Sequence, residues 1–377
     1  MSYKILIINS SPFLPIKNGS NKAIYEYCNI LKELGAELYF CCFPYSSIPQ
    51  ETINYFNNNV FNYQRSLKRK LFSKAVISKF RLKFCRDHRI DDYYPWGIEH
   101  LINSLDNTYH FDMCIINYIT LSKVFDYIKI PRKVVFTHDV FSNKLKILGT
   151  NNFWFYLTPN EEAKGLERCT DIIAIQENEA IFFHYLAPQK NIYTVYSPFP
   201  IVSHPLTYNN NILFIAGNNM LNFNGIKFFL DKIFPKILRE VPSVNLLIGG
   251  SICNALSEYS QCKEIKLLGN VKDINKFYDK GDIAINPVYQ GTGLKIKTFE
   301  ALSHGKITIV HRHSADGIFN PNKAPLLIAE NPKQFIDLII STLKDYKLRQ
   351  IYSESSLKYI SELNSYVKNQ YTKIINK

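Results

Sequence analysis

The feature that most constrains the fold of this chain is a repeated alternation of short apolar segments with longer amphipathic ones. In the first half, strands are predicted at residues 4–9, 37–43, 113–117, 133–137, 171–175 and 191–195, and helices at 23–34, 161–168 and 178–186. Gly35 stands where a helix over 23–34 would end. Strands separated by helices form parallel β–α–β units, so the pattern predicts an α/β fold with a parallel sheet.

The alternation becomes more regular beyond residue 211. Strands are predicted at 212–216, 245–248, 265–268, 283–286, 307–310 and 326–329, and helices at 226–240, 274–280 and 295–304, which is the pattern of a doubly wound sheet. Ser197-Pro-Phe-Pro200 and the polar stretch that follows interrupt the pattern. We therefore expect a first domain over 1–200, a second over 208–331, and C-terminal helices over 332–377 that are candidates for packing back on the first domain.

Composition limits the classes of function. The chain has no run of about twenty apolar residues, and the apolar run near its N-terminus is too short for a signal peptide, so we expect a cytoplasmic protein. Its eight cysteines never form Cys-x-x-Cys and are predicted to be reduced core residues. The net charge of +13 requires an anionic partner, and nucleic acid, nucleotide, acidic glycan and anionic lipid all remain open.

Much of the positive charge lies in an insert over residues 64–90. Lys and Arg recur there between apolar residues at helical spacing, which predicts a basic amphipathic helix able to lie on the inner face of the cytoplasmic membrane. The alternative is a solvated helix whose apolar stripe packs on its own domain. Nucleic-acid binding is a weaker interpretation, because most aromatic residues fall in predicted core segments.

The most informative motif, residues 286–305, is a predicted strand followed by a glycine-containing loop that opens a helix. Gly291 and Gly293 allow close approach of the backbone, and the helix N-terminus offers N–H groups to a phosphate. Lys295 and Lys297 oppose the helix dipole unless an anion is bound. Glu300, one turn further, is positioned to accept hydrogen bonds from sugar hydroxyls. A solvent-exposed loop with a charged helix face is the alternative.

Two segments of the first half are also candidate sites. Gly19 lies between the first strand and the first helix, where it allows close approach of a diphosphate or acceptor, although a plain connection would explain it equally well. His138 and Asp139 directly follow a predicted strand, at the end that faces a ligand crevice, and could orient a sugar or accept a proton. His311 and His313 alternate after a strand without a completing carboxylate or Cys, so we predict no metal site.

The motif resembles the nucleotide-sugar loop of GT-B glycosyltransferases of group 1 (retaining, GT4-like): it reads Gly291-Thr-Gly-Leu-Lys-Ile-Lys-Thr-Phe-Glu-Ala301, then Gly305. Further matches in order are Phe214-Ile-Ala-Gly217, Asn224-Gly225, residues 244–250, Leu268-Gly-Asn-Val271 and Asp316-Gly317. The resemblance implies GT-B architecture, with two Rossmann-like domains facing a central cleft.

The resemblance also implies roles for single residues. Glu300 would bind the ribose, Lys295 or Lys297 the diphosphate, backbone near Val271 and Lys272 the base, and amides of residues 292–294 the phosphate and sugar. The implied donor-binding residues are Gly19, Gly217, Asn218, Gly250, Val271, Lys272, Thr292, Gly293, Leu294, Lys297 and Glu300, and the implied catalytic residues are His138, Asp139 and Lys295. Many retaining members carry a Glu where this chain has Thr292, and the Arg and Lys that follow the first strand of this domain in those members are absent from residues 217–222.

The resemblance implies a retaining glycosyltransferase, and we expect it to be metal-independent and to need no cofactor. It would move a sugar from a nucleotide-sugar donor to a glycan or lipid-linked acceptor in the synthesis of bacterial surface polysaccharide or glycoconjugate. The alternatives are a sugar-nucleotide epimerase on the same fold and a non-enzymatic protein that binds nucleic acid or a membrane surface.

Overall fold

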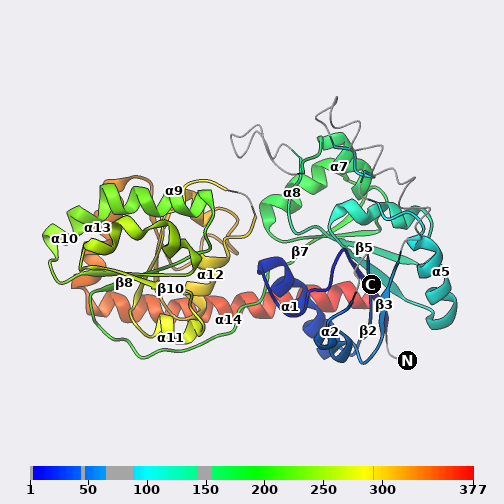
Figure 1. Ribbon diagram of the computed structural model, residues 1–377, viewed down its shortest axis with the longest axis horizontal. Coiled ribbons are helices and arrows are strands. Elements are labelled where there is room, and N and C mark those ends of the chain that lie inside the picture. Colours follow the sequence, from blue (N-terminus) through cyan, green and yellow to red (C-terminus); the bar gives the residue numbers. More distant parts are fainter. Residues whose placement is uncertain (1–2, 44–46, 65–87, 93, 143–154, 292) are drawn as a thin grey trace. The chain divides into compact units, whose positions relative to one another are not determined.

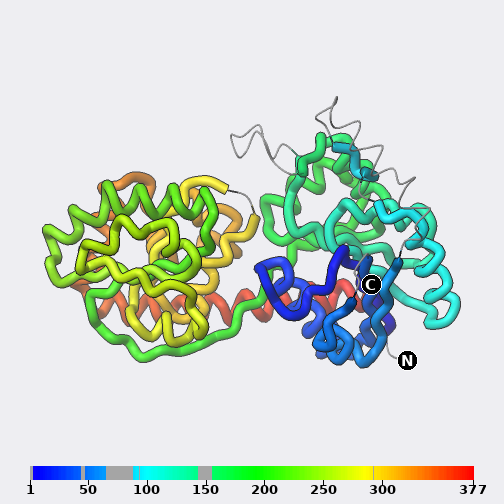
Figure 2. Tube along the Cα trace, in the orientation of Figure 1, coloured from blue at the N-terminus to red at the C-terminus, as the bar shows by residue number. Residues whose placement is uncertain are grey.

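A computed structural model describes residues 3–43, 47–64, 88–92, 94–142, 155–291 and 293–377. The chain divides into two compact units, each built around a parallel sheet with helices on both faces (Figure 1). Unit 1 comprises Met1–Ser197 and Val367–Lys377, and unit 2 comprises Pro198–Tyr366. The C-terminal residues thus belong to the same unit as the N-terminal half of the chain (Figure 2).

Unit 1 contains a seven-stranded sheet whose strands all pair in parallel. In sheet order the strands are β3 (Val60–Asn62), β2 (Glu37–Cys42), β1 (Lys4–Asn9), β4 (Met113–Asn117), β5 (Arg132–Phe136), β6 (Asp171–Ala174) and β7 (Asn191–Thr194). The helices are α1 (Gly19–Glu33), α2 (Gln50–Tyr55), α5 (Ile98–Tyr109), the 3₁₀ helix η1 (Ile119–Asp126), α7 (Pro159–Leu166) and α8 (Glu177–Leu186).

The faces of this sheet are covered by different helices. Buried residues of α5, α7 and α8, such as Ile102, Leu166 and Phe183, join one continuous apolar cluster with β1 and β4. On the other side, Tyr27 of α1 stacks on Tyr371 of the last helix, with ring centroids 6.4 Å apart. The apolar alternation in the sequence therefore corresponds to a sheet buried on both faces.

Unit 2 contains a six-stranded parallel sheet. Its order is β10 (Ile265–Gly269), β9 (Asn245–Gly249), β8 (Asn211–Ile215), β11 (Ile283–Asn286), β12 (Ile307–His311) and β13 (Leu326–Ala329). Figure 1 shows α9 (Met220–Phe228), α10 (Phe234–Glu240) and α13 (Pro332–Lys344) on one face, and α11 (Ile274–Tyr278), α12 (Ile296–Ser303) and α14 (Tyr346–Asn376) on the other. Short 3₁₀ helices η3 (Ser251–Ala255), η4 (Ser257–Gln261) and η5 (Arg312–Ala315) follow strand ends.

The helix predicted at 226–240 is longer and less regular in the structure. It begins at Met220, because the side chain of Asn219 accepts a hydrogen bond from the backbone N–H of Asn222 and caps the first turn. Between α9 and α10 lies a single π-helical turn, η2 (Phe229–Ile233), directly before Pro235 in the first turn of α10. Proline has no N–H to continue the regular hydrogen-bond ladder, which explains the change at this point.

A buried ion pair joins α14 to the sheet of unit 2. Asp282, immediately before β11, and Arg349 of α14 are both fully buried, with a 3.2 Å contact between Oδ2 and Nη1. Asp282 also accepts hydrogen bonds from the backbone N–H groups of Thr207 and Tyr208, at 2.8 and 2.7 Å. One carboxylate therefore fixes the segment entering β8, the start of β11 and the first turns of α14.

Candidate active site

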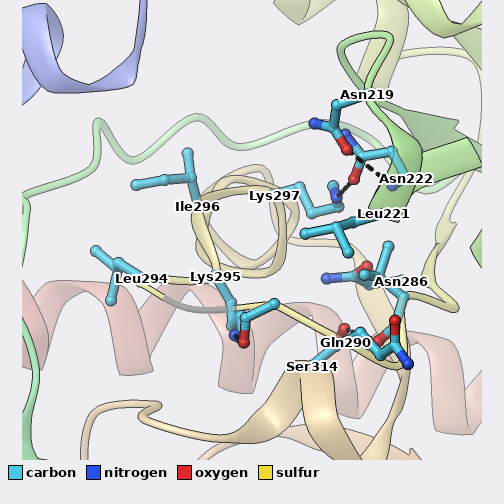
Figure 3. Close-up of a pocket in the computed structure, with 12 residues that line it drawn as sticks. Asn219, Leu221, Asn222, Asn286, Gln290, Leu294, Lys295, Ile296, Lys297 and Ser314 are labelled. Carbon is cyan, nitrogen blue, oxygen red and sulfur yellow. Dashed lines mark hydrogen bonds between the residues drawn. The ribbon is translucent and has the colours of Figure 1, made fainter. Parts of the chain in front are cut away.

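The strand order of unit 2 creates a crevice at the carboxyl edge of its sheet. From β8 the chain passes to β9 and β10 on one side, and the later strands β11, β12 and β13 lie on the other side of β8. The loops after β8 and β11 therefore diverge, and ligands of doubly wound sheets bind at such a switch point. A cavity of about 260 Å³ lies here, lined by residues that follow β8, β11 and β12 and by the start of α12 (Figure 3).

Two lysines give this cavity its electrostatic character. Lys295 and Lys297 both line it, and no Asp or Glu stands among the described residues that do so. The Nζ atom of Lys297 donates a hydrogen bond to Oδ1 of Asn222 (Figure 3). Nδ2 of Asn222 in turn donates to the carbonyl oxygen of Gly217 at 2.9 Å. Burial, with a smaller contribution from the charge of Lys295, lowers the pKa of Lys297 to about 8. An anion bound in the cavity would offset this cost.

Lys295 lies at the N-terminus of α12. Its Nζ atom is 3.5 Å from the carbonyl oxygen of Gly291 and 3.4 Å from Nε2 of His313. Burial and the charge of Lys295 lower the pKa of His313. Lys295 is also the N-cap residue of α12, and no side chain caps this end of the helix. Backbone N–H groups at an uncapped helix end add to the attraction for an anion.

The glycine loop before α12 has the backbone that the sequence predicts. Gly291 and Gly293 have φ angles of +130° and +73°, in a region where side chains other than glycine are strained. Leu294 lines the cavity together with the two lysines, whereas Thr292 lies outside the described residues. The loop therefore brings Leu294, Lys295 and Lys297 to one cavity.

The remaining donor-binding candidates of unit 2 lie after strands of its sheet and do not line the cavity. Gly217 and Asn218 follow β8, Gly250 follows β9, and Val271 and exposed Lys272 follow β10. Gly250 has a φ angle of +94°, and a Cβ atom there would lie 2.2 Å from the carbonyl oxygen of Ala216. Gly250 is thus required for two strand ends to approach each other.

Glu300 lies one helical turn beyond Lys297 on α12, is half-buried, and does not line the cavity. Its charge contributes, after burial, to raising the pKa of the Tyr278 hydroxyl. Tyr278 stacks on His304 with ring centroids 4.3 Å apart. Glu300 therefore lies toward α11, on the same helix as the two lysines and further from its N-terminus.

In unit 1, His138 follows β5 in a strained conformation. Its φ angle is +61°, and that of Tyr118, which follows the neighbouring strand β4, is +70°. The two rings stack with centroids 4.5 Å apart. Nε2 of His138 lies 2.8 Å from Oδ1 of Asn117, an acceptor, so this nitrogen carries the proton. Burial lowers the pKa of His138 to about 3, so the ring is neutral at physiological pH.

The other unit 1 candidates lie at the same carboxyl edge. Gly19 begins α1, capped by Asn18, and nothing lies within 4 Å of a Cβ atom added to Gly19. Burial raises the pKa of the Tyr118 hydroxyl, and a hydrogen bond with Ser20, the residue after Gly19, opposes this rise. The start of α1 thus contacts the stacked rings. The carboxylate of Asp139 accepts a hydrogen bond from the backbone N–H of Val140 at 2.9 Å.

Sequence reasoning missed four residues that the structure brings to these edges. Asn222 holds Lys297, Asn286 lines the cavity at the end of β11, and Asn117 and Tyr118 contact His138. A recurrent signal was present, because β1, β4 and β11 each end in asparagine. A polar residue that ends an otherwise apolar parallel strand lies at the ligand edge of the sheet.

Several other predictions concern features that the structure covers only in part. Within the described ranges, no three His, Cys, Asp or Glu side chains gather as a metal site would require. No described helix combines the length and apolar character needed to cross a membrane. Most of the basic insert over 64–90 lies outside the described residues.

Comparison with known proteins finds a family model that matches part of unit 2. Residues 209–345 match the family model of glycosyl transferases group 1. A segment of 179 residues is 27% identical to an uncharacterized 44.6 kDa protein in the cps region of Klebsiella pneumoniae, covering 43% of this chain and 46% of that protein. The match thus spans about half the length of this curated relative.

Solved structures resemble the whole chain at low sequence identity. TarM has a TM-score of 0.71 at 10% identity, covering 100% of this chain and 99% of TarM. HepE from Anabaena, solved in complex with UDP, has a TM-score of 0.68 at 11% identity, covering 99% and 100%. Sucrose-phosphate synthase from Thermosynechococcus elongatus has a TM-score of 0.68 at 13% identity, covering 99% and 98%.

The two Rossmann-like units and the likeness to these solved structures define the GT-B fold. Residues 209–345, within unit 2, resemble the glycosyl transferases of group 1. The GT-B fold and the family resemblance predicted from the sequence are confirmed.

Proposed function

We propose that this protein transfers a sugar from a nucleotide-sugar donor to a glycan or lipid-linked acceptor. The observation that carries the proposal is the cavity at the switch point of unit 2, where two lysines and an uncapped helix end meet without an acidic residue among the described lining. A diphosphate is the ligand that such a site favours. The group 1 family match and the solved complexes of similar folds with UDP support this choice.

The same groups would assist the reaction. As the bond between the anomeric carbon and the diphosphate breaks, negative charge builds on the departing oxygen. Lys295, Lys297 and the helix-terminal N–H groups are arranged to stabilise that charge, which is the electrostatic contribution that a leaving diphosphate needs. We propose that transfer is metal-independent for this reason, and that it proceeds with retention, as the family resemblance implies.

His138 is proposed to orient the reacting groups at the edge of unit 1. Its lowered pKa makes it a poor acceptor for a proton, whereas Nδ1 of the neutral ring can accept a hydrogen bond from a hydroxyl group. Asp139 and the start of α1 at Gly19 lie at the same edge and are proposed to contact acceptor or donor.

The biological setting is proposed from the relatives. The match to a protein of a cps region favours synthesis of bacterial surface polysaccharide. Such an acceptor would be presented at the cytoplasmic face of the membrane, and the basic residues of 64–90 are suited to peripheral contact with anionic lipid. The comparisons do not favour the epimerase or nucleic-acid alternatives.

A thermal-shift screen tests the proposal. The purified protein is melted with UDP, GDP, dTDP, CMP and ADP and with their common sugars, because a specific ligand raises the melting temperature by mass action. We expect one nucleotide family to raise it clearly. If none does while nucleic acid or anionic vesicles bind tightly, the proposed function is wrong.

Two variants separate binding from turnover. Glu300→Ala should weaken binding of the donor, because the proposed ribose contact is lost, whereas Lys295→Ala should depress turnover. Normal binding and turnover in both variants would contradict the site assignment. Conversion of the donor to an epimer without acceptor, followed by proton NMR, would instead support the epimerase alternative.

A further inference from the structure

Asn286 has an unusual hydrogen-bonding state. It ends β11, and its side chain is buried with 3% exposure. Its Nδ2 donates to Oγ1 of Thr298 at 3.0 Å, and that hydroxyl in turn donates to the carbonyl oxygen of Ser314 at 3.3 Å. Because the single hydroxyl hydrogen of Thr298 is used on Ser314, Thr298 must accept from Asn286. This series of hydrogen bonds distinguishes the amide nitrogen of the Asn286 side chain from its oxygen.

The carboxamide oxygen of Asn286 therefore points away from Thr298. Among the described residues this buried oxygen has no hydrogen-bond partner, and Asn286 lines the lysine cavity (Figure 3). An unsatisfied buried acceptor costs about 1–3 kcal/mol, and such groups are rare in native proteins. The structure thus presents an acceptor beside a cavity that a ligand could satisfy.

The chemistry of this acceptor selects among the parts of a nucleotide sugar. Diphosphate oxygens only accept hydrogen bonds, so they pair with Lys295 and Lys297 and not with the carboxamide oxygen of Asn286. The base is expected near Val271 and Lys272, which do not line this cavity. The ribose also has hydroxyl groups that donate, but it is expected at Glu300, which does not line this cavity. The sugar is left as the part whose hydroxyl groups can donate to Asn286.

We propose that the carboxamide oxygen of Asn286 accepts a hydrogen bond from a hydroxyl group of the donor's sugar, which makes Asn286 a specificity-determining residue. This inference rests on the proposed function. It also accounts for a difference from the family pattern. At the position where many retaining members carry a Glu, this chain has Thr292, so the acceptor that the Glu carboxylate would supply is missing. Asn286 supplies a neutral acceptor in the same domain.

The test compares two ligands in three variants. Dissociation constants are measured by calorimetry for the nucleoside diphosphate and for the corresponding nucleotide sugar identified in the screen. In Asn286→Ala we expect the nucleotide sugar to bind about tenfold more weakly, while the nucleoside diphosphate changes less than about twofold. Asn286→Asp keeps an acceptor and should keep the preference for the sugar-bearing ligand, although its charge weakens both. Asn245→Ala, at the opposite edge of the same sheet, is the control and should change neither.

Deoxy-sugar nucleotides identify the hydroxyl. In the wild-type protein each missing hydroxyl should cost affinity, and in Asn286→Ala one of these losses should disappear, because the contact is already gone. Equal weakening of both ligands by Asn286→Ala, or no change in either, would overturn the inference, as expected if an internal water satisfies the oxygen. Failure of the wild-type protein to bind either ligand would instead overturn the proposed function itself.

Discussion

At the residue scale, Lys297 carries the main functional argument. A lysine is costly to bury, yet Lys297 is held by Asn222 and lies beside Lys295 without an acidic residue among the described lining of the cavity. A cation whose pKa is lowered in this way is a candidate for a binding site. The sequence showed that both lysines begin a helix, and the structure adds that Asn222 from another loop positions one of them.

The lowered pKa of Lys297 predicts a pH dependence for binding. Only the protonated amine attracts a diphosphate, and a bound diphosphate raises its pKa above the free value of about 8. Affinity should therefore be nearly constant below pH 8 and fall as the pH rises above it, by about tenfold between pH 7 and 9. Calorimetric titrations with the nucleoside diphosphate across this range measure the effect. An affinity that rises with pH would contradict the assignment.

Lys297→Met separates binding from stability. The variant removes the buried charge and retains most of the volume, so the free protein should melt at or near the wild-type temperature. The temperature rise on adding nucleotide should be lost. Replacement of Lys263, whose side chain is 90% exposed, by Met is the control and should leave the rise intact.

His138 predicts a second, independent pH behaviour. A ring with a pKa of about 3 does not titrate between pH 5 and 8. The pH profile of turnover should therefore show no rise or fall due to His138 in that range. His138→Gln should lower kcat while leaving donor affinity within about twofold. A change of turnover with pH near 6.5 that is present in the wild-type protein and absent from this variant would show that His138 acts as a base.

At the element scale, the loops after parallel strands determine the site, and their glycines differ in importance. Gly250 has a positive φ angle and no room for a Cβ atom, whereas Gly217 has nothing within 4 Å of one. Gly250→Ala should therefore lower the free energy of unfolding by about 2 kcal/mol or more, and Gly217→Ala by less than about 1 kcal/mol. Urea unfolding followed by circular dichroism measures both. Equal losses in the free energy of unfolding would mean that the close approach of Gly250 to Ala216 does not determine the cost of adding a Cβ atom.

Element positions were largely predictable from the sequence because apolar strands and amphipathic helices alternate strictly. The strands at Met113–Asn117, Ile283–Asn286 and Leu326–Ala329 were predicted to the residue. Helix starts were predicted less well, because the capping asparagines Asn18 and Asn219 begin α1 and α9 earlier than apolar periodicity indicates. Short β3 lacks a sufficient pattern of its own and is specified by pairing with β2.

At the scale of the whole molecule, unit 2 depends on the buried pair of Asp282 and Arg349. Removing one partner leaves the other charge buried, so Arg349→Met should lower the free energy of unfolding by about 3–5 kcal/mol. The double variant Asp282→Asn with Arg349→Met should recover part of this loss. Urea unfolding of the wild-type protein and both variants measures these changes. A loss below about 1 kcal/mol for Arg349→Met would show that the backbone N–H groups of Thr207 and Tyr208 stabilise the buried Asp282 carboxylate without Arg349.

Sequence reasoning predicted the parallel α/β fold of both units and the glycine and lysine loop, but not the contacts made between loops. Asn222, Asn286 and Tyr118 are remote in sequence from the residues they serve, and no local pattern connects Asn222 with Lys297 or Tyr118 with His138. These contacts arise from strand order, which brings the ends of β8 and β11, and of β4 and β5, side by side.

The most direct test of the central claim is a calorimetric titration of the nucleoside diphosphate selected by the screen into the wild-type protein and the Lys295→Ala, Lys297→Met double variant. The account predicts one binding site per chain in the wild-type protein and at least a hundredfold loss of affinity in the folded double variant, because both cations of the cavity are removed. Undiminished binding in the double variant would show that the diphosphate lies elsewhere and would contradict the account.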